Sequence, residues 1–314
     1  MQLRLGVQVE PQFGFNYLDI LNIAKAAEDN NFSHLWLSDH FFLDENAVDK
    51  PCLDLLSVIA ALSRETSTLR LGSLVLSNSY RHPAVLAKAL ATIDHLSAGR
   101  LEWGYGAGWK EVEYNAYGIP YPSAGVRIKQ LVEGIQVIRK LWSDDKANFQ
   151  GEYYQLKDAI SAPKPVQEGG PPLWVGTMKA GPKMLRVIGE YAHGANIAWR
   201  YTPDQVRDIR DKINVTAEQI GRSVELSLGL WAALYPSEEA FEEGLASRAK
   251  ERGLAVDDLR DRLVGAMHGS PDYWVNQLKA YADVGVETFV FMFPHGQEVE
   301  QVRLVNELVI PRLR

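Results

Sequence analysis

Short hydrophobic runs alternate with longer stretches of helical periodicity along almost the whole chain. Strands that are hydrophobic nearly throughout, each followed by a helix, are typical of a parallel sheet covered by helices. Eight such runs predict strands at residues 3–9, 34–39, 69–76, 100–106, 173–177, 194–199, 224–234 and 287–293. Helical patterns lie at 18–30, 54–65, from 83 onward, 125–142, 182–193, 203–220 and, in several pieces, 237–282.

Eight β/α repeats within 314 residues fit a (β/α)8 barrel better than a doubly wound sheet. No Pro/Ser/Gly-rich linker divides the chain, so residues 1–314 are predicted to form one barrel domain. The longest departure is an insertion between strands four and five, residues 107–172. Its second part, 149–172, has many turn formers and no strong periodicity. Long loops in compact domains are usually functional or disordered, and we expect this one at the C-terminal mouth of the barrel.

Composition narrows the classes of function. The formal net charge of −7 argues against a nucleic-acid partner, since phosphate backbones require a basic surface. No apolar run approaches the roughly 18 residues of a membrane span, and the N-terminus lacks the apolar core of a signal peptide. Cys52 is the single cysteine, so no intramolecular disulfide can form. No residue near it in the sequence is an evident base that would activate it as a nucleophile. We expect a cytoplasmic enzyme with a small-molecule substrate and without nucleic-acid or membrane partners.

The stretch RLEWGYGAGWKEVEY places Gly104, Gly106 and Gly108 at alternate positions after the fourth strand. A dinucleotide-binding turn needs G-x-G-x-x-G, but Trp109 stands three residues after Gly106. No Gly-Lys-Ser/Thr follows, which excludes a P-loop. Two interpretations stay open: the small residues pack inside a barrel, or they leave one strand face bare for a flat ligand at the mouth.

A second glycine-bearing turn, GTMKAGP, joins the fifth strand to a helix that starts near Pro182. Backbone N–H groups of such a turn and the helix N-terminus favour an anion, and barrels often bind phosphate in this way. Lys179 and Lys183 add positive charge. The alternative is an ordinary βα loop. The two glycine-rich strand ends together favour a flat, phosphorylated ligand.

The stretch WLSDHFF places Asp39 and His40 at the end of the second strand, where barrel enzymes carry catalytic residues. Histidine suits proton transfer near neutral pH, although a lone strand-end histidine is more often structural. The other histidines show no metal-ligand spacing, so we predict no metal site. Two interpretations of Glu111 and Glu113 stay open: they supply a carboxylate to the site, or they are solvated, as loop carboxylates usually are.

The stretches LRLGSLVLSNSYRHPAVLAKALATIDHLSAGRLEWGYGAGWKEVEYNAYG and PLWVGTMKAGPKMLRVIGEYAHGAN resemble the luciferase-like monooxygenase superfamily. Within it, the chain is more similar to oxidoreductases that use the deazaflavin coenzyme F420. The resemblance includes the closing GSPDYWVNQLKAYADVGVETFVFMFP and LVNELVIPRLR, and so covers nearly the whole chain. It implies a (β/α)8 barrel with an insertion, and commonly a homodimer.

The resemblance also implies where the cofactor lies. The tricyclic ring is expected at the C-terminal mouth against a strand-three bulge, whose non-proline cis peptide falls at Ser73–Leu74 when counted back from HPAV. His40 is implied as the catalytic proton carrier, with Asp39 orienting it or contacting the ring. The implied cofactor-binding residues are Asp39, Ser73, Leu74, Ala107, Gly108, Trp109, Gly176, Thr177, Met178 and Lys179.

The leading hypothesis is therefore hydride transfer between F420 and a small organic substrate. F420-dependent sugar-phosphate dehydrogenases carry a tryptophan shortly after SDHF and a glutamate after the strand-four glycine, where this chain has Asp44 and Trp109. Glucose 6-phosphate is accordingly not the expected substrate. The alternatives are an FMN-dependent monooxygenase, a cofactor-binding barrel without turnover, and a non-redox phosphosugar enzyme.

Overall fold

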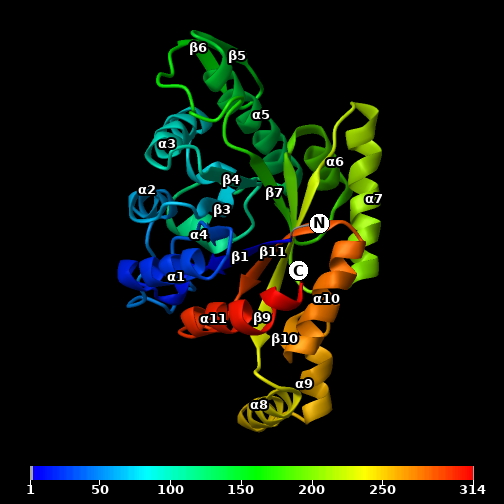
Figure 1. Cartoon of the computed structure of the whole chain (residues 1–314). Helices are drawn as coiled ribbons and strands as arrows, with labels where there is room; N and C mark the ends of the chain where they lie inside the picture. Colours follow the sequence, from blue (N-terminus) through cyan, green and yellow to red (C-terminus); the bar gives the residue numbers. More distant parts are fainter. Residues whose placement is uncertain (1–2, 314) are drawn as a thin grey trace.

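A closed barrel of eight parallel strands forms the centre of the molecule. The computed structural model describes residues 3–313. Strand order is β11-β1-β2-β3-β4-β7-β8-β9, and β9 also pairs with β11, which closes the ring. Figure 1 shows these strands surrounded by helices. The barrel strands are β1 (Arg4–Val9), β2 (His34–Leu37), β3 (Arg70–Ser77), β4 (Leu101–Gly106), β7 (Leu173–Thr177), β8 (Gly194–Ile197), β9 (Glu225–Leu234) and β11 (Val286–Met292).

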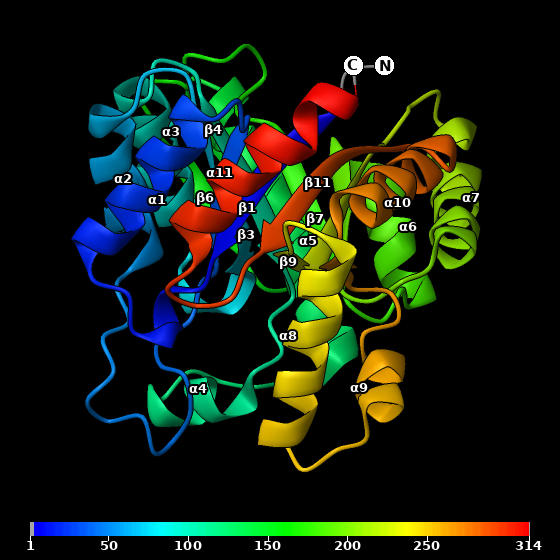
Figure 2. The same ribbon diagram turned by 60° about the horizontal axis from the view of Figure 1, so that its bottom comes forward.

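Helices follow the strands and cover the outside of the barrel. Figure 2 shows α4, α8 and α9 together on the side toward which the strands end. A short strand, β10 (Met267–Gly269), extends the sheet beside the end of β9. The helices are α1 (Tyr17–Asp29), α2 (Leu55–Glu65), α3 (Pro83–Leu96), α4 (Glu111–Ala116), α5 (Ala124–Ser143), α6 (Pro182–Tyr191), α7 (Pro203–Gln219), α8 (Glu238–Glu251), α9 (Val256–Arg262), α10 (Pro271–Asp283) and α11 (Glu298–Leu308).

Large and small residues alternate across the barrel interior. A Cβ atom at Gly72 would lie 2.2 Å from the ring of Trp36, and one at Gly194 would lie 2.3 Å from the ring of Trp174. The two indoles, T-shaped with centroids 5.8 Å apart, thus occupy the space that neighbouring strands leave free. The barrel is a packed core, and ligands must bind at its ends.

The predicted fold class is confirmed, and all eight predicted strands form the barrel. Within residues 107–172, the pattern missed α4 and the antiparallel hairpin of β5 (Ala147–Gln150) and β6 (Gln155–Ala159). Farther on it missed α11, although the apolar positions Val299, Val302 and Val305 have helical spacing.

The expected place of the second half of the insertion was wrong. Figure 1 shows the β5–β6 hairpin beside α3 and α5, far from α8 and α9. The chain then passes under the N-terminal ends of the strands, where Gln167 Nε2 donates to the Leu101 carbonyl and Trp103 Nε1 donates to the Pro171 carbonyl. The reason is connectivity: α5 returns the chain to the N-terminal end of the barrel, where β7 must begin.

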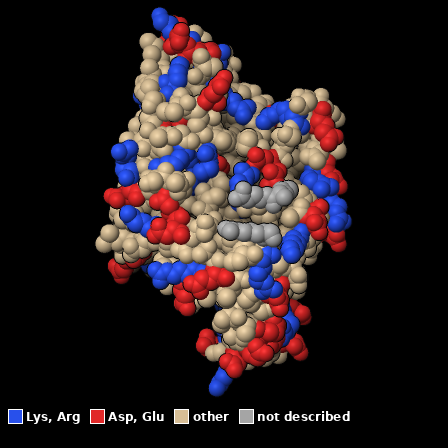
Figure 3. All heavy atoms as spheres, viewed as in Figure 1, with Lys and Arg blue, Asp and Glu red and all other residues tan. Residues whose placement is uncertain are grey.

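The surface carries charges of both signs, with acidic side chains gathered on the projecting α8–α9 pair (Figure 3). None of the helices within residues 3–313 is long and apolar enough to cross a membrane.

Candidate active site

The predicted site residues lie at the C-terminal ends of neighbouring strands. Asp39 and His40 follow β2, the irregular part of β3 lies beside them, and Trp109 follows β4. Thr177 ends β7, which pairs with β4. Since all these strands are parallel, their ends meet at one face of the barrel, where (β/α)8 enzymes carry their active sites.

His40 is held by a buried carboxylate. Its Nδ1 lies 3.1 and 3.0 Å from Oε1 and Oε2 of Glu113, whose side chain is fully buried. Phe41 N, Tyr80 Oη and Lys110 Nζ donate to the same carboxylate. Burial acts to raise the pKa of Glu113, but hydrogen bonds from His40, Tyr80 and Phe41 outweigh it and hold the pKa at about 2. Glu113 is therefore an ionised hydrogen-bond acceptor near neutral pH.

Of the two interpretations of these glutamates, the solvated one is wrong for Glu113, which is buried against His40, and holds for Glu111, which is exposed. Both residues belong to α4, whose first turn faces the loop after β2 on one side only. The pattern did not predict α4, and so it could not show that Glu113 lies on the helix face turned toward the loop after β2 while Glu111 lies on the exposed face.

The second ring nitrogen of His40 is available for chemistry. Within the described residues, Nε2 has no hydrogen-bond partner, and the side chain is 14% exposed. The ring of Trp109, itself 58% exposed, stands edge-on to the imidazole with centroids 5.7 Å apart. A carboxylate that accepts from Nδ1 fixes the tautomer and leaves Nε2 to accept or release a proton.

Asp39 has a different partner from the one expected. Its carboxylate accepts hydrogen bonds from Arg81 Nη1 at 2.9 and 2.8 Å and from Ser77 N at 3.0 Å. Burial raises the pKa of Asp39, with Arg81 opposing the shift. No hydrogen bond joins Asp39 to His40 within residues 3–313. Asp39 anchors Arg81 and the end of β3, and the carboxylate that is hydrogen-bonded to His40 is that of Glu113.

A bulge in β3 fills the space that the strand-four glycines leave. Pairing with β4 is regular up to Ser73 and resumes at Leu76. The side chain of Val75 turns inward, so that Cβ atoms at Gly104 and Gly106 would lie 2.7 and 2.8 Å from its methyl groups. The packing interpretation of these glycines is therefore correct, and the bare strand face is covered by Val75.

The non-proline cis peptide lies one residue later than predicted, at Leu74–Val75 rather than Ser73–Leu74. Ser73 still belongs to the regular ladder: its Oγ donates to the Gly104 carbonyl and accepts from Gly104 N. The irregular peptide thus begins only after Ser73.

The backbone conformation at position 108 requires glycine. Its φ is +76°, and a Cβ there would lie 1.7 Å from Tyr114 Oη, which shares a hydrogen bond of 2.7 Å with Ser77 Oγ. Ala107 beside it is half-buried. This turn leads the chain from β4 to the exposed Trp109.

The turn after β7 presents a helix N-terminus. Thr177 Oγ1 accepts from Ala180 N at 2.9 Å, and Gly181 is the N-cap of α6. A Cβ at Gly181 would meet nothing within 4 Å, so the space before the helix is open. Met178, 47% exposed, and Lys179 flank this space. The N–H groups and the positive end of α6 suit a phosphate.

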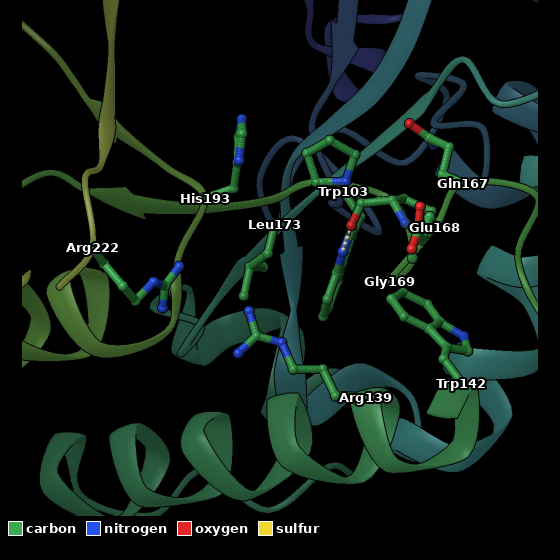
Figure 4. A pocket seen from close by; sticks show the side chains of 12 residues that line it. Trp103, Arg139, Trp142, Gln167, Glu168, Gly169, Leu173, His193 and Arg222 are labelled. Carbon is green, nitrogen blue, oxygen red and sulfur yellow. Dashed lines mark hydrogen bonds between the residues drawn. The ribbon is translucent and has the colours of Figure 1, made fainter. Parts of the chain in front are cut away.

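Two cavities have linings that do not include His40. One of about 920 Å³ lies between the segment after β2 and α4, lined by Phe41, Tyr117 and their neighbours. The other, about 570 Å³, lies at the N-terminal end of the barrel (Figure 4). Among residues 3–313, no cluster of three or more His, Cys, Asp or Glu side chains is arranged for a metal ion.

Sequence reasoning missed the polar shell around Asp39 and His40, namely Ser77, Tyr80, Arg81 and Lys110. A usable signal was present: the polar stretch SNSYR begins at the last residue of β3, at the same barrel face as SDH after β2.

Comparison with known proteins identifies the family of this chain. The luciferase-like monooxygenase family model matches residues 4–288, and the chain belongs to this family. Curated relatives include F420-dependent glucose-6-phosphate dehydrogenases of Amycolatopsis mediterranei (strain U-32), 29% identical over 99% of each chain, and of Microbacterium testaceum (strain StLB037), 26% identical over 99% of this chain and 98% of the relative.

Solved structures share the fold across the whole chain. The coenzyme F420-dependent tetrahydromethanopterin reductase of Methanopyrus kandleri has a TM-score of 0.81 at 22% identity, with both chains fully covered. A monooxygenase of Streptomyces bottropensis has a TM-score of 0.83 at 21% identity, covering 99% of this chain and all of that one. The predicted resemblance to the family is thus confirmed.

Proposed function

We propose that this protein binds coenzyme F420 at the C-terminal face of the barrel and exchanges a hydride between that coenzyme and a small organic substrate. The curated relatives are F420-dependent dehydrogenases, which supports this cofactor. When bound, the deazaflavin ring supplies the carbon that accepts or gives the hydride. The protein's part is to hold the ring against the substrate, exclude water and move the accompanying proton.

The residues present fit such a group. The open N-terminus of α6 before Gly181 suits the phosphate, with Thr177 and Lys179 at its edge. The inward-turned Val75 gives an apolar surface over the glycines of β4 and β7 that suits a flat ring. FMN also carries a flat ring and a phosphate, so an FMN-dependent monooxygenase is the second candidate; the solved structures of this fold include a monooxygenase.

His40 is the proposed catalytic residue. Nε2 of His40 takes the proton from a substrate hydroxyl, or returns it to a carbonyl oxygen in the reverse direction. Glu113 acts through His40 as a positioning residue, because it accepts from Nδ1 and stays ionised. Asp39 positions Arg81 and β3. The single observation that carries the proposal is the unbonded Nε2 of His40 at a barrel mouth that also presents an anion-binding helix end.

A titration of the cofactor-free protein with F420 and separately with FMN tests the proposal. Micromolar or tighter binding of F420 together with weak FMN binding is expected. The converse preference would replace the proposal by the flavin monooxygenase, and binding of neither would overturn the redox assignment.

Substitutions at Gly181 test the phosphate position. Gly181→Asp places a carboxylate before α6, where it caps the helix favourably but repels a phosphate. We expect F420 affinity to fall by about tenfold or more, as for loss of a charge-assisted contact. Gly181→Ala is the matched control, because its Cβ meets no neighbour and its affinity should stay unchanged. Equal affinities of the two variants would place the phosphate elsewhere.

The substrate differs in our proposal from glucose 6-phosphate, which the names of the relatives indicate for them. Trp109 beside His40 and the stacked rings of Phe41, Tyr80 and Tyr117 give this mouth aromatic side chains. A screen of alcohols and ketones beside glucose 6-phosphate tests this; turnover of the sugar phosphate above all others would contradict it.

We also propose that the protein forms a homodimer, which analytical ultracentrifugation tests.

A further inference from the structure

The cavity of about 570 Å³ at the N-terminal end of the barrel has the features of a binding site. It lies between α5, the segment 167–173 and the residues that precede β8 and β9. Figure 4 shows the side chains of Arg139 and Arg222 extending toward one another from α5 and from the segment before β9. Its volume lies within the range of small-molecule sites.

The two arginines are fixed in place by backbone. Arg222 donates to the carbonyls of Glu190 and Ala192, and Arg139 donates to the carbonyl of Tyr191. These carbonyls end α6, so both guanidinium groups are anchored at one helix C-terminus. Each guanidinium has five N–H donors, which leaves several on each side chain for another acceptor.

Neither guanidinium is neutralised by a carboxylate. Within residues 3–313, no ion pair joins Arg139 or Arg222 to an acidic side chain, and the one carboxylate at the rim, Glu168, is exposed. Burial and the neighbouring Arg222 lower the pKa of Arg139, as expected for two half-buried like charges. An anion between them would relieve this repulsion.

One side of the remaining wall is apolar and aromatic, and the polar side chains of Gln167 and His193 line the rest. Trp103 and Trp142 stand edge to face with centroids 5.5 Å apart, and their indole N–H groups already donate to the carbonyls of Pro171 and Ala87. Leu173 and the Pro171–Pro172 pair complete this side. Gln167 is already hydrogen-bonded to Asp94 and Arg70, and His193 Nε2 lies 3.3 Å from Glu225 Oε1. The indole side of the cavity therefore suits a flat hydrocarbon body.

We propose that this cavity binds a small organic anion, whose phosphate or carboxylate lies between Arg139 and Arg222 and whose planar apolar part packs against Trp142. The site lies at the end of the barrel opposite His40 and does not depend on the function proposed above.

Fluorine NMR of protein labelled with 5-fluorotryptophan tests the proposal. The chain has eight tryptophans, so the resonances of Trp103 and Trp142 can be assigned with Phe variants. Phenyl phosphate, benzoate and inorganic phosphate are added separately, up to about 10 mM, well above the Kd of about 1 mM of a weakly bound small ligand. We expect saturable shifts of the Trp103 and Trp142 resonances. Whichever of phenyl phosphate and benzoate binds more tightly identifies the anionic group as a phosphate or a carboxylate.

Variants show whether the arginines are responsible. Arg139→Gln and Arg222→Gln should each weaken binding by about tenfold or more, as expected for loss of charge-assisted hydrogen bonds. Arg207→Gln on α7, which removes an exposed arginine, is the matched control and should bind like the native protein.

Because the two arginines also cap α6, a third variant avoids that contact. Glu168→Gln removes the exposed acid at the rim and should tighten binding by about threefold. The proposal is overturned if the Trp103 and Trp142 resonances do not move, or if they move equally in the native protein and the Arg139 and Arg222 variants. Shifts confined to Trp109 would report binding at the barrel mouth beside His40 instead and would likewise overturn it.

Discussion

Two histidine–glutamate pairs lie at different levels of the same barrel and show what distinguishes a structural pair from a reactive one. In the interior, His34 Nε2 lies 3.3 Å from Glu102 Oε1, and Nδ1 lies 2.7 Å from Ser33 Oγ. At the mouth, His40 Nδ1 lies 3.0 Å from Glu113, and Nε2 has no partner among the described residues. Both carboxylates are buried and have a pKa of about 2, with burial opposed by their hydrogen bonds.

The difference is in the histidine and not in the carboxylate. Glu102 also accepts from Arg70 and from Trp174 Nε1, so its pair is part of a sealed network in which every ring nitrogen is used. His34 is 1% exposed, whereas His40 faces outward next to Trp109. A depressed carboxylate pKa alone therefore does not mark an active site; the free nitrogen at the strand end does.

The largest expected effect is on turnover at the mouth. His40→Asn should lower kcat by about 10² to 10⁴, since general acid–base catalysis contributes this much. The melting temperature should change little, because Nε2 makes no contact that the fold needs. Single-turnover rates with F420 and the substrate from the screen measure the effect. His95→Asn on the surface is the control, and equal rates in the two variants would refute the role of His40.

The interior pair should respond in stability instead. Glu102→Gln leaves Arg70 and His34 without a charged partner, and breaking a buried ion pair costs about 3–5 kcal/mol in the free energy of unfolding. Urea denaturation measures this, with the exposed Glu111→Gln as control. A loss below about 0.5 kcal/mol, the usual effect of a surface substitution, would contradict the account of the sealed network.

Acid should weaken both pairs. The pKa of each glutamate is lowered from 4.5 in the unfolded chain to about 2 in the folded protein. Each therefore contributes stability that is present above pH 4.5 and is lost as the pH falls from there toward 2. The advantage of the native protein over Glu102→Gln or Glu113→Gln should shrink in that window. Stability curves that stay parallel down to pH 2 would show that the glutamates are not ionised in the fold.

The smallest expected effect is at Trp109. Trp109→Leu removes an exposed ring that packs on His40, so the free energy of unfolding should stay within about 0.5 kcal/mol of the native value. KM for the substrate should rise severalfold with kcat nearly unchanged. A large fall in kcat with constant KM would instead assign Trp109 to the chemical step.

Most of the fold could be predicted from the continuous apolar runs of the strands, because each barrel strand is buried on both faces. The site was harder to predict. Asp39 and His40 could be predicted because they directly follow a strand, but their partners Arg81 and Glu113 come from the segment after β3 and from α4. Pairing across loops depends on tertiary packing, as does the inward turn of Val75 that explains Gly104 and Gly106. The insertion was misplaced for another reason: its second half follows α5, which has already returned the chain to the N-terminal end of the barrel.

The most direct test follows the two histidines themselves during cofactor binding. In protein labelled with ¹⁵N-histidine, with assignments from His34 and His40 variants, F420 is added while its optical spectrum reports binding. The Nε2 resonance of His40 should move in step with saturation, and both nitrogens of His34 should stay where they are. An unchanged His40 resonance at full saturation with F420 would contradict the proposal that this residue serves the cofactor site.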